Sequence, residues 1–282
     1  MNKDELRALA LELFNTLEGN ILTDDMDIEP QYAGLRLYDA PLIGFGAADD
    51  ALYEEYKKPG IIGPWHMSPA EWLPGAKSVI SVFLPFSEEV RSSNRKETEH
   101  ASIPWVYARI EGQQYVVKFI TAFAARLAEA GYRFCIPQGD PRWQAVHAGS
   151  GIEGYDEVMT PATFGSRWSE RHTAFVCGLG TFGLSKGIIT ERGMAGRFCS
   201  LVTDLAVEPD KRPYTDVYEY CIHCSACVRR CPVQAIDPVT GKDHPTCYAF
   251  MGQSKIMFAP RYGCGLCQTN VPCEACNPSI HP

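Results

Sequence analysis

Cysteine spacing places the strongest constraint on what this chain can become. Nine of its twelve cysteines lie between Cys221 and Cys276, and CIHCSACVRRCP (residues 221–232) spaces four of them as C-x2-C-x2-C-x3-C-P. Bacterial ferredoxins use this run for iron–sulfur clusters, and its fourth cysteine ligates a different cluster from the first three. The sequence therefore predicts that this end of the chain is a metal-binding unit.

If Cys231 serves a second cluster, later cysteines must complete both ligand sets. Two [4Fe–4S] clusters need eight thiolates, and nine cysteines are present. The late ligand of the first cluster is Cys273 or Cys276. We favour Cys273, although its separation from the preceding cysteine by five residues departs from the usual three. The other predicted ligands are Cys221, Cys224 and Cys227 for the first cluster, and Cys231, Cys247, Cys264 and Cys267 for the second.

Structural zinc is the alternative for the same cysteines, because two C-x2-C pairs can make a four-thiolate ribbon. The run of three closely spaced cysteines followed by Cys-Pro favours clusters. Structural disulfides are disfavoured, because the chain shows no secretory signal and a reducing compartment keeps thiols free. The zinc pairs would be Cys224 with Cys227 and Cys264 with Cys267, while the scattered Cys135, Cys177 and Cys199 are predicted to be small buried hydrophobes.

Length and composition indicate a soluble globular protein. The chain has 282 residues, of which 45% are hydrophobic and 21% charged. We predict a large domain over residues 1–215 and a cluster domain over residues 216–282, with the polar stretch EPDKRPYTD (208–216) at the boundary. The net charge of −8 argues against a broad basic surface for nucleic acid, although it leaves room for a local basic patch.

No targeting or membrane segment is expected. Residues 1–19 have apolar side chains at three- and four-residue spacing among charged ones, which is typical of an amphipathic helix and not of a secretory signal. No run of 18 apolar residues occurs, so no membrane span is predicted. The predicted location is the cytoplasm.

Sequence patterns predict an α+β architecture. Ser68 and Glu71 form a capping-box pattern at a helix start. Residues 104–131 begin with proline and end with glycine, as a long helix does. Residues 167–183 are expected to begin as a helix and to break at the glycines. Strands are expected at 40–46, 78–83 and 132–137, and a two-stranded hairpin at 186–190 and 197–207.

The stretch GLGTFG (178–183) satisfies the G-x-G-x-x-G pattern of dinucleotide-binding folds. That fold needs a strand before the glycines and a helix after them. The following LSKGIITERG is a poor helix, because it carries β-branched residues and two more glycines. The glycines are better explained by close approach of the backbone to a large flat cofactor, or by a tight turn.

The order of motifs resembles the epoxyqueuosine reductase family, whose catalytic core is related to reductive dehalogenases. The resemblance covers most of residues 70–275, through YAR (107–109), Glu170-x7-GLG, VTDL (202–205) and the ferredoxin tail. It implies a nitroreductase-like α/β core that holds a base-off corrinoid (cobalamin). It also implies two [4Fe–4S] clusters that relay electrons to cobalt. The family chemistry is reduction of an epoxide or a carbon–halogen bond by low-valent cobalt.

Three departures from the family bear on the substrate. The family's queuosine enzymes carry an aspartate proton donor shortly before the position of Glu170, where counting back here reaches Phe164. They often continue into helical repeats that help to hold tRNA, whereas this chain ends at Pro282, as a short form would. The Trp and Lys of their glycine turn are replaced in register by Thr181 to Leu184. tRNA therefore stays open as a partner, and the corrinoid–cluster core is the firmer implication.

Candidate site residues follow from these motifs. His172 and Glu170 also suit purely structural roles, as a satisfied buried histidine and as a partner of Arg171. The two candidate tyrosines lie eight residues apart on one helix and also suit its core face. The candidate proton donors are Tyr107, Tyr115, Glu170 and His172, and the candidate cofactor-binding residues are Arg109, Gly178, Gly180, Thr181, Phe182, Gly183 and Lys186.

Three functions fit the sequence. The first is a corrinoid-dependent reductase of a small-molecule or nucleoside-like substrate. It would be fed by a low-potential electron donor such as ferredoxin or flavodoxin. The second is a redox-partner protein that reduces or activates another corrinoid or radical enzyme. The third is a flavin- or nicotinamide-dependent reductase on the same core. The roughly 215 residues outside the cluster unit favour a protein with its own cofactor or substrate pocket over a simple electron carrier.

Overall fold

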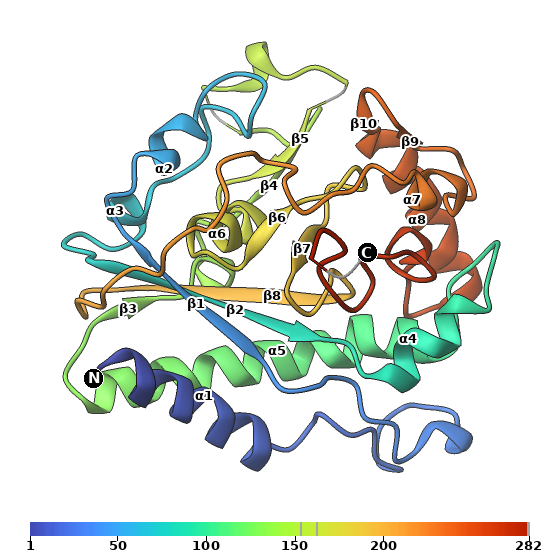
Figure 1. Cartoon of the computed structure of the whole chain (residues 1–282), viewed down its shortest axis with the longest axis horizontal. Coiled ribbons are helices and arrows are strands. Elements are labelled where there is room, and N and C mark those ends of the chain that lie inside the picture. The colour runs from blue at the N-terminus through green and yellow to red at the C-terminus, as the bar shows by residue number, and fades with distance from the viewer. Residues whose placement is uncertain (153, 162, 281–282) are drawn as a thin grey trace.

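An antiparallel sheet of four strands lies at the centre of the computed structural model, which describes residues 1–152, 154–161 and 163–280 (Figure 1). The strand order is β1–β2–β8–β3. The strands are β1 (Leu42–Ala47), β2 (Ser78–Pro85), β8 (Gly196–Thr203) and β3 (Phe134–Cys135). The predicted strands at 40–46, 78–83 and 132–137 are therefore confirmed, and the chain has a mixed α/β fold.

Of the two central strands, β2 is buried along its whole length and β8 is buried over its last five residues. Every residue of β2 is buried, which explains why its sequence SVISVFLP is apolar without alternation. β2 pairs along its whole length with β8, from Ser78 opposite Thr203 to Pro85 opposite Gly196. Helices therefore have to cover both faces of this sheet.

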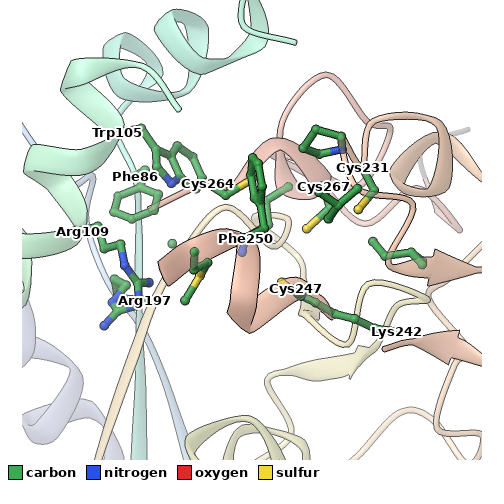
Figure 2. Close-up of a pocket in the computed structure, with 17 residues that line it drawn as sticks. Phe86, Trp105, Arg109, Arg197, Cys231, Lys242, Cys247, Phe250, Cys264 and Cys267 are labelled. Carbon is green, nitrogen blue, oxygen red and sulfur yellow. The ribbon is translucent and has the colours of Figure 1, made fainter. Parts of the chain in front are cut away.

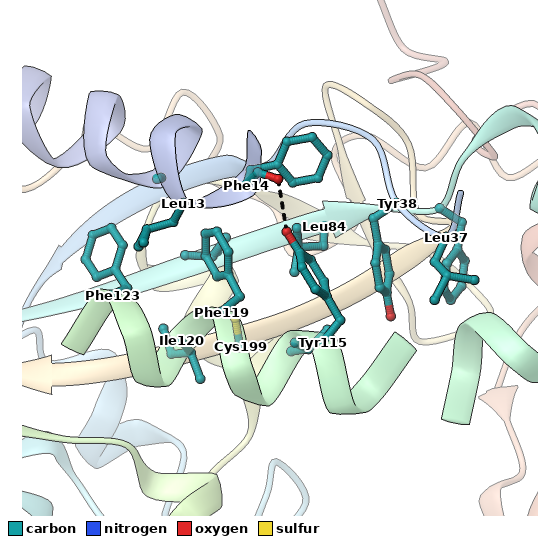
Figure 3. Close-up of a cluster of buried hydrophobic side chains, with 14 of the residues drawn as sticks. Leu13, Phe14, Leu37, Tyr38, Leu84, Tyr115, Phe119, Ile120, Phe123 and Cys199 are labelled. Carbon is teal, nitrogen blue, oxygen red and sulfur yellow. Dashed lines mark hydrogen bonds between the residues drawn. The ribbon is translucent and has the colours of Figure 1, made fainter. Parts of the chain in front are cut away.

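The long helix α5 (Ile103–Glu129) covers one face, as predicted. Its N-terminus is capped by Ser102, whose hydroxyl accepts a hydrogen bond from the Trp105 amide at 3.3 Å. The amphipathic helix α1 (Lys3–Thr16) packs against α5, and Figure 3 shows Leu13 and Phe14 of α1 next to the aromatic side chains that α5 projects toward it. The shorter α6 (Glu170–Val176) contacts β2 and β8.

The predicted hairpin of residues 186–190 and 197–207 is wrong. Residues Ile188–Thr190 form β7, which pairs with β6 (Gly180–Phe182), whereas β8 pairs with β2 and β3. The two segments separate because β8 is a long apolar strand that finds its partners far away in the sequence. Local turn signals do not register such a preference.

The glycine run lies in a context that no dinucleotide fold has, since a helix precedes it and the strand β6 lies within it. Gly178 has φ +78° and follows the last turn of α6. A Cβ on Gly180 would lie 1.9 Å from the carbonyl oxygen of Ile189. The glycines thus end a helix and permit close pairing of β6 with β7.

The cysteine-rich region packs directly on this core. The amides of Met194 and Ala195 donate to the carbonyls of Cys273 and Glu274, at 2.9 and 3.2 Å. The predicted boundary stretch runs along the edge strand β1, where the Asp210 amide donates to the Phe45 carbonyl at 2.8 Å. The division of the chain at residues 215 and 216 stays a prediction.

The capping box at Ser68 is confirmed, because Glu71 accepts from the Ser68 amide at 2.7 Å at the start of α3.

None of the described helices combines the length with the apolar character needed to cross a membrane. The remaining elements are α2 (Leu52–Glu55), α3 (Pro69–Trp72), α4 (Glu88–Arg95), β4 (Ala145–His147), β5 (Phe164–Ser166), α7 (Ala226–Arg229), β9 (Ile236–Asp237), β10 (Gly241–Lys242), α8 (His244–Phe258) and 3-10 turns at Pro30–Tyr32, Pro137–Gly139, Asp156–Val158 and Leu266–Gln268.

Candidate functional site

Four cysteines meet in a cavity between α8 and the core (Figure 2). They come from the turn after α7, from α8 and from the loop that carries the last 3-10 turn. Arg109 and Arg197 of the core lie at the opposite end of the same cavity. The cysteines that line it are Cys231, Cys247, Cys264 and Cys267, the set predicted for the second cluster.

Glycines allow the loop of this cavity to lie flat on the core. Gly265 has φ +71°, and a Cβ on it would lie 2.0 Å from the Trp105 ring. The Ala235 amide donates to the Cys231 sulfur at 3.1 Å. Amide hydrogen bonds to thiolate sulfur are a usual means of tuning iron–sulfur clusters.

A second group of cysteines lines another cavity, against the turn after β6 and the Met194 side chain. Burial raises the pKa of Cys273, and the neighbouring thiols raise it further because they lie close enough to repel its thiolate. The Cys276 sulfur is directed elsewhere, 3.5 Å from the Pro272 carbonyl oxygen. The lining cysteines are Cys221, Cys224, Cys227 and Cys273.

Both groups fit iron–sulfur clusters better than a zinc ribbon. None of the twelve cysteines is in a disulfide. The two C-x2-C pairs that a ribbon would join line different cavities. In the described parts of the chain, no group of three or more His, Cys, Asp or Glu side chains is arranged to hold a single metal ion. Four thiols around one cavity, twice over, form the donor set that [4Fe–4S] clusters take.

A larger cavity of about 640 Å³ lies beside α6, and we call it the α6 pocket. Its walls are largely aromatic. The His172 ring lies 4.7 Å from Tyr56 and 4.9 Å from Phe182, and Phe164 stacks on His244 at 4.5 Å. Small-molecule and cofactor sites have this size and apolar character. Its polar lining includes Ser169, Arg171, His172, Lys186, Tyr218 and His244.

Two cations line the α6 pocket, and one of them holds the backbone of the other. Arg171 donates to the Lys186 carbonyl at 2.6 Å, and the Lys186 ammonium donates to the Tyr218 hydroxyl. Burial lowers the pKa of Arg171. Burial, with the nearby Arg171 charge, lowers the pKa of His172 to about 3, so this ring is neutral at physiological pH.

Glu170 lies on the other side of α6, where it lines a cavity of about 600 Å³ between α5, β3 and β8. Both carboxylate oxygens of Glu170 are buried without a hydrogen-bond partner among the described residues, and the neighbouring Trp168 indole donates to Ser200 at 2.9 Å. Burial raises the pKa of Glu170 to about 7, while Ser200 and Trp168 act in the opposite direction. This carboxyl group can therefore exchange a proton near neutral pH.

The two candidate tyrosines lie away from the α6 pocket. The Tyr107 hydroxyl accepts from the Glu29 amide at 2.9 Å, and Tyr115 donates to the Phe14 carbonyl at 3.3 Å inside the core (Figure 3). Burial raises the pKa of Tyr115 to about 12. Both contacts are of the structural kind.

The other candidates divide between the cavities and the protein's own backbone. His172, Phe182 and Lys186 line the α6 pocket, and Arg109 lines the cavity of Cys231, Cys247, Cys264 and Cys267, where it lies over the Tyr262 ring at 4.6 Å. Thr181 is fully buried and accepts from the Tyr220 amide. The glycines face neighbouring chain: a Cβ on Gly178 would meet the Lys211 carbonyl oxygen and one on Gly183 the Ile189 side chain, each at 3.3 Å, as Gly180 meets the Ile189 carbonyl.

Sequence reasoning missed part of this site. Tyr218 and His244 precede predicted ligand cysteines in the chain, and nothing in the sequence indicates that they face α6. Arg171 was considered only as a partner for its neighbour Glu170, whereas its guanidinium lines the pocket. Phe164, at the position of the missing aspartate, turns out to be an aromatic wall residue.

The chain was compared with family models, with curated proteins and with solved structures. Residues 214–237 match the family described as 4Fe-4S binding domain. A search of curated proteins returned no match.

Solved structures with a similar fold are reductases. An epoxyqueuosine reductase, solved with a tRNA-Tyr epoxyqueuosine-modified stem loop, has 19% identity and a TM-score of 0.54, with 96% of this chain and 65% of that chain covered. The enzyme from Streptococcus thermophilus has 18% identity and a TM-score of 0.54, with 97% and 66% covered. A catabolic reductive dehalogenase, in complex with 3-bromo-4-hydroxybenzoic acid, has 14% identity and a TM-score of 0.52, with 97% and 36% covered.

This chain spans about two thirds of the length of those epoxyqueuosine reductases. With sequence identities below one fifth, the structural similarity to these proteins establishes a shared fold and nothing beyond the fold. The chain thus has the fold of epoxyqueuosine reductases and reductive dehalogenases, which are oxidoreductases, and it carries a 4Fe-4S binding domain.

Proposed function

We propose that this protein is an iron–sulfur reductase in which two [4Fe–4S] clusters pass electrons to a corrinoid, which reduces a small electrophilic substrate. The observation that carries the proposal is the gathering of eight cysteines into two sets of four around separate cavities. One set reaches the core beside Trp105 and Arg109, so electrons would leave the second cluster toward the core. A soluble low-potential donor such as ferredoxin or flavodoxin would supply them.

The α6 pocket supports a cofactor with a flat ring system. Aromatic side chains form its walls, and two cations suit a negative group on the ligand. The resemblance to corrinoid reductases favours cobalamin, and the antiparallel sheet between α5 and α6 is compatible with a nitroreductase-like core. When bound, cobalamin would supply low-valent cobalt as the reductant. A flavin also suits a cavity of this shape, and it is the second candidate.

Glu170 stays a candidate proton donor, but it lines the cavity on the other side of α6, so it would act on a ligand that enters that cavity and not on one held in the α6 pocket. Its pKa of about 7 keeps a proton on the carboxyl group for part of the population at neutral pH. The neutral His172 would line the pocket and exclude water from it. The contacts of Tyr107 and Tyr115 favour support of the helix over proton transfer.

Anaerobic purification in the presence of cobalamin tests the proposal. Two cubanes require about eight iron atoms per chain. About one equivalent of cobalt, together with reduction of the bound corrinoid by the photoreduced clusters, supports the corrinoid assignment. A flavin spectrum without cobalt supports the second candidate, and a protein with clusters but no further cofactor would be a redox partner.

Cysteine variants test the ligand sets. Cys224→Ala and Cys231→Ala should disturb different clusters, seen as loss of different signals in electron paramagnetic resonance spectra of the reduced protein. Cys276→Ala is the matched control for Cys273→Ala, because of these two cysteines only Cys273 lines the cavity of Cys221, Cys224 and Cys227. Equal iron loss in the last two variants would refute the assignment of the eighth ligand.

A further inference from the structure

The α6 pocket is lined by positive side chains, although the chain as a whole is negatively charged. The protein carries a net charge of −8, yet Arg171 and Lys186 both line this pocket. The pocket's acidic residue is Glu55, which is already bound to Lys58 at 2.6 Å. The interior of the pocket is therefore locally positive.

Neither cation has an acidic partner in the described structure. No carboxylate of the described residues lies within ion-pair distance of Arg171 or Lys186, whose polar contacts are with the Lys186 carbonyl and the Tyr218 hydroxyl. Withdrawing a charge from water is costly unless the charge is paired. The Arg171 charge is partly offset by the nearby Cys247 and Cys267 thiols once these are deprotonated, whereas the Lys186 ammonium has only the Tyr218 hydroxyl and can receive an anion.

The backbone also holds Lys186 in an uncommon conformation. Its φ of +61° lies in the left-handed region, and its amide donates to the Gly183 carbonyl at 2.8 Å. Arg171 holds the same turn through the Lys186 carbonyl. Left-handed residues other than glycine persist where the surroundings fix them, and they cluster at ligand-binding sites.

We propose that the α6 pocket binds a planar ligand that carries a carboxylate or phosphate, with Arg171 and Lys186 as its anion-binding residues. The ring would lie against Phe182 and the aromatic faces of His172 and of the Phe164–His244 stack. The negative group would complete the hydrogen bonds of the two cations. The inference deepens the proposed function by naming the ligand class of the same pocket, and the anion belongs either to the substrate or to the phosphate of the cofactor.

Isothermal titration on the anaerobic, cluster-loaded full-length chain tests the anion site without turnover. Benzoate and phenyl phosphate are the anionic probes, and benzamide is the neutral analogue. Wild type should bind the anions roughly tenfold or more tightly than benzamide, since hydrogen bonds to charged groups exceed neutral ones by about this factor. Lys186→Gln should remove most of that preference, and Lys186→Arg should retain it. Lys118→Gln removes an exposed lysine of α5 and should change nothing.

The ratio between benzoate and benzamide guards against a variant that merely folds poorly, since general damage lowers both affinities together. Equal affinities in wild type, or a preference that survives in Lys186→Gln and in Arg171→Gln alike, would overturn the proposal.

Cobalamin and cobinamide separate the two sources of the anion, because cobinamide lacks the nucleotide phosphate. If Lys186→Gln weakens cobalamin binding but not cobinamide binding, the anion is that of the cofactor. If it weakens neither, but weakens benzoate binding to the corrinoid-loaded protein, the anion is that of the substrate. Full iron and cobalt loading without anion preference would remove this site and leave the reductase proposal intact. A preference for anions in a protein that binds no cobalt would support the anion site and count against the corrinoid assignment.

Discussion

Replacing Gly193 with alanine tests how the core positions the first cluster. Gly193 has φ +73° in the turn after β7, and a Cβ there would lie 2.2 Å from the Glu274 carbonyl oxygen. Neither the turn nor the neighbouring chain can accommodate that atom without movement. The chain that must move carries Cys273, the proposed eighth ligand.

The expected cost has two parts. Left-handed backbone costs an alanine about 1–2 kcal/mol. Moving the 273–275 segment also breaks the hydrogen bonds from the Met194 and Ala195 amides, at about 1 kcal/mol each. The sum is about 3–4 kcal/mol. At roughly 2 °C per kcal/mol for a chain of this size, the melting temperature should fall by about 6–8 °C.

Gly34→Ala is the matched control. Gly34 has φ +87°, but no atom lies within 4 Å of its Cβ position, so this variant carries the backbone cost alone. Scanning fluorimetry and iron analysis compare the two variants under anaerobic conditions. We expect Gly34→Ala to keep about eight iron atoms and Gly193→Ala to lose about half of them. If both variants melt together and retain full iron, the proposed link between the turn and the first cluster is refuted.

Three further changes probe other parts of the structure. Between pH 4.5 and about 7, folded Glu170 keeps a proton that the unfolded chain releases, so stability should decline by up to about 3 kcal/mol as the pH rises through this range. Glu170→Gln should flatten that part of the melting curve against pH, and an unchanged slope would contradict the buried carboxyl. Tyr115→Phe removes the bond to the Phe14 carbonyl and should cost about 1 kcal/mol in thermal denaturation, with no loss of iron. Arg230→Gln removes a guanidinium that donates to four backbone carbonyls, from the end of α4 and the turn after it and from residues 266–269. This variant should lose iron from the second cluster. Full iron content would show that the loop of residues 264–269 keeps its position without Arg230.

Local patterns in the sequence predicted much of the scaffold. The capping box at Ser68, the proline and glycine bounds of α5 and the apolar run of β2 each act through neighbours a few residues away. The hairpin prediction failed at β8, because its pairing with β2 joins segments on opposite sides of α5 in the sequence. Such long-range pairing leaves no local signature.

The cluster ligands and the α6 pocket differ in the same way. Thiol spacing within a short loop specifies a cluster site almost directly, because the metal imposes the geometry. The α6 pocket instead needs Tyr218 and His244, from the start and the middle of the cysteine-rich region, to face Arg171 and Phe182 of the core. Only the docked arrangement of the two regions brings these side chains together.

The pairing of β2 with β8 has a consequence for how the protein is made. The register joins Ser78 to Thr203, more than 100 residues apart, so the central sheet cannot close until the ribosome has released residue 203. The first of the proposed ligand cysteines, Cys221, follows that point in the chain. Synthesis from the N-terminus therefore allows the scaffold to fold before the cluster thiols emerge. The clusters would then be inserted into loops that can already pack against a folded core.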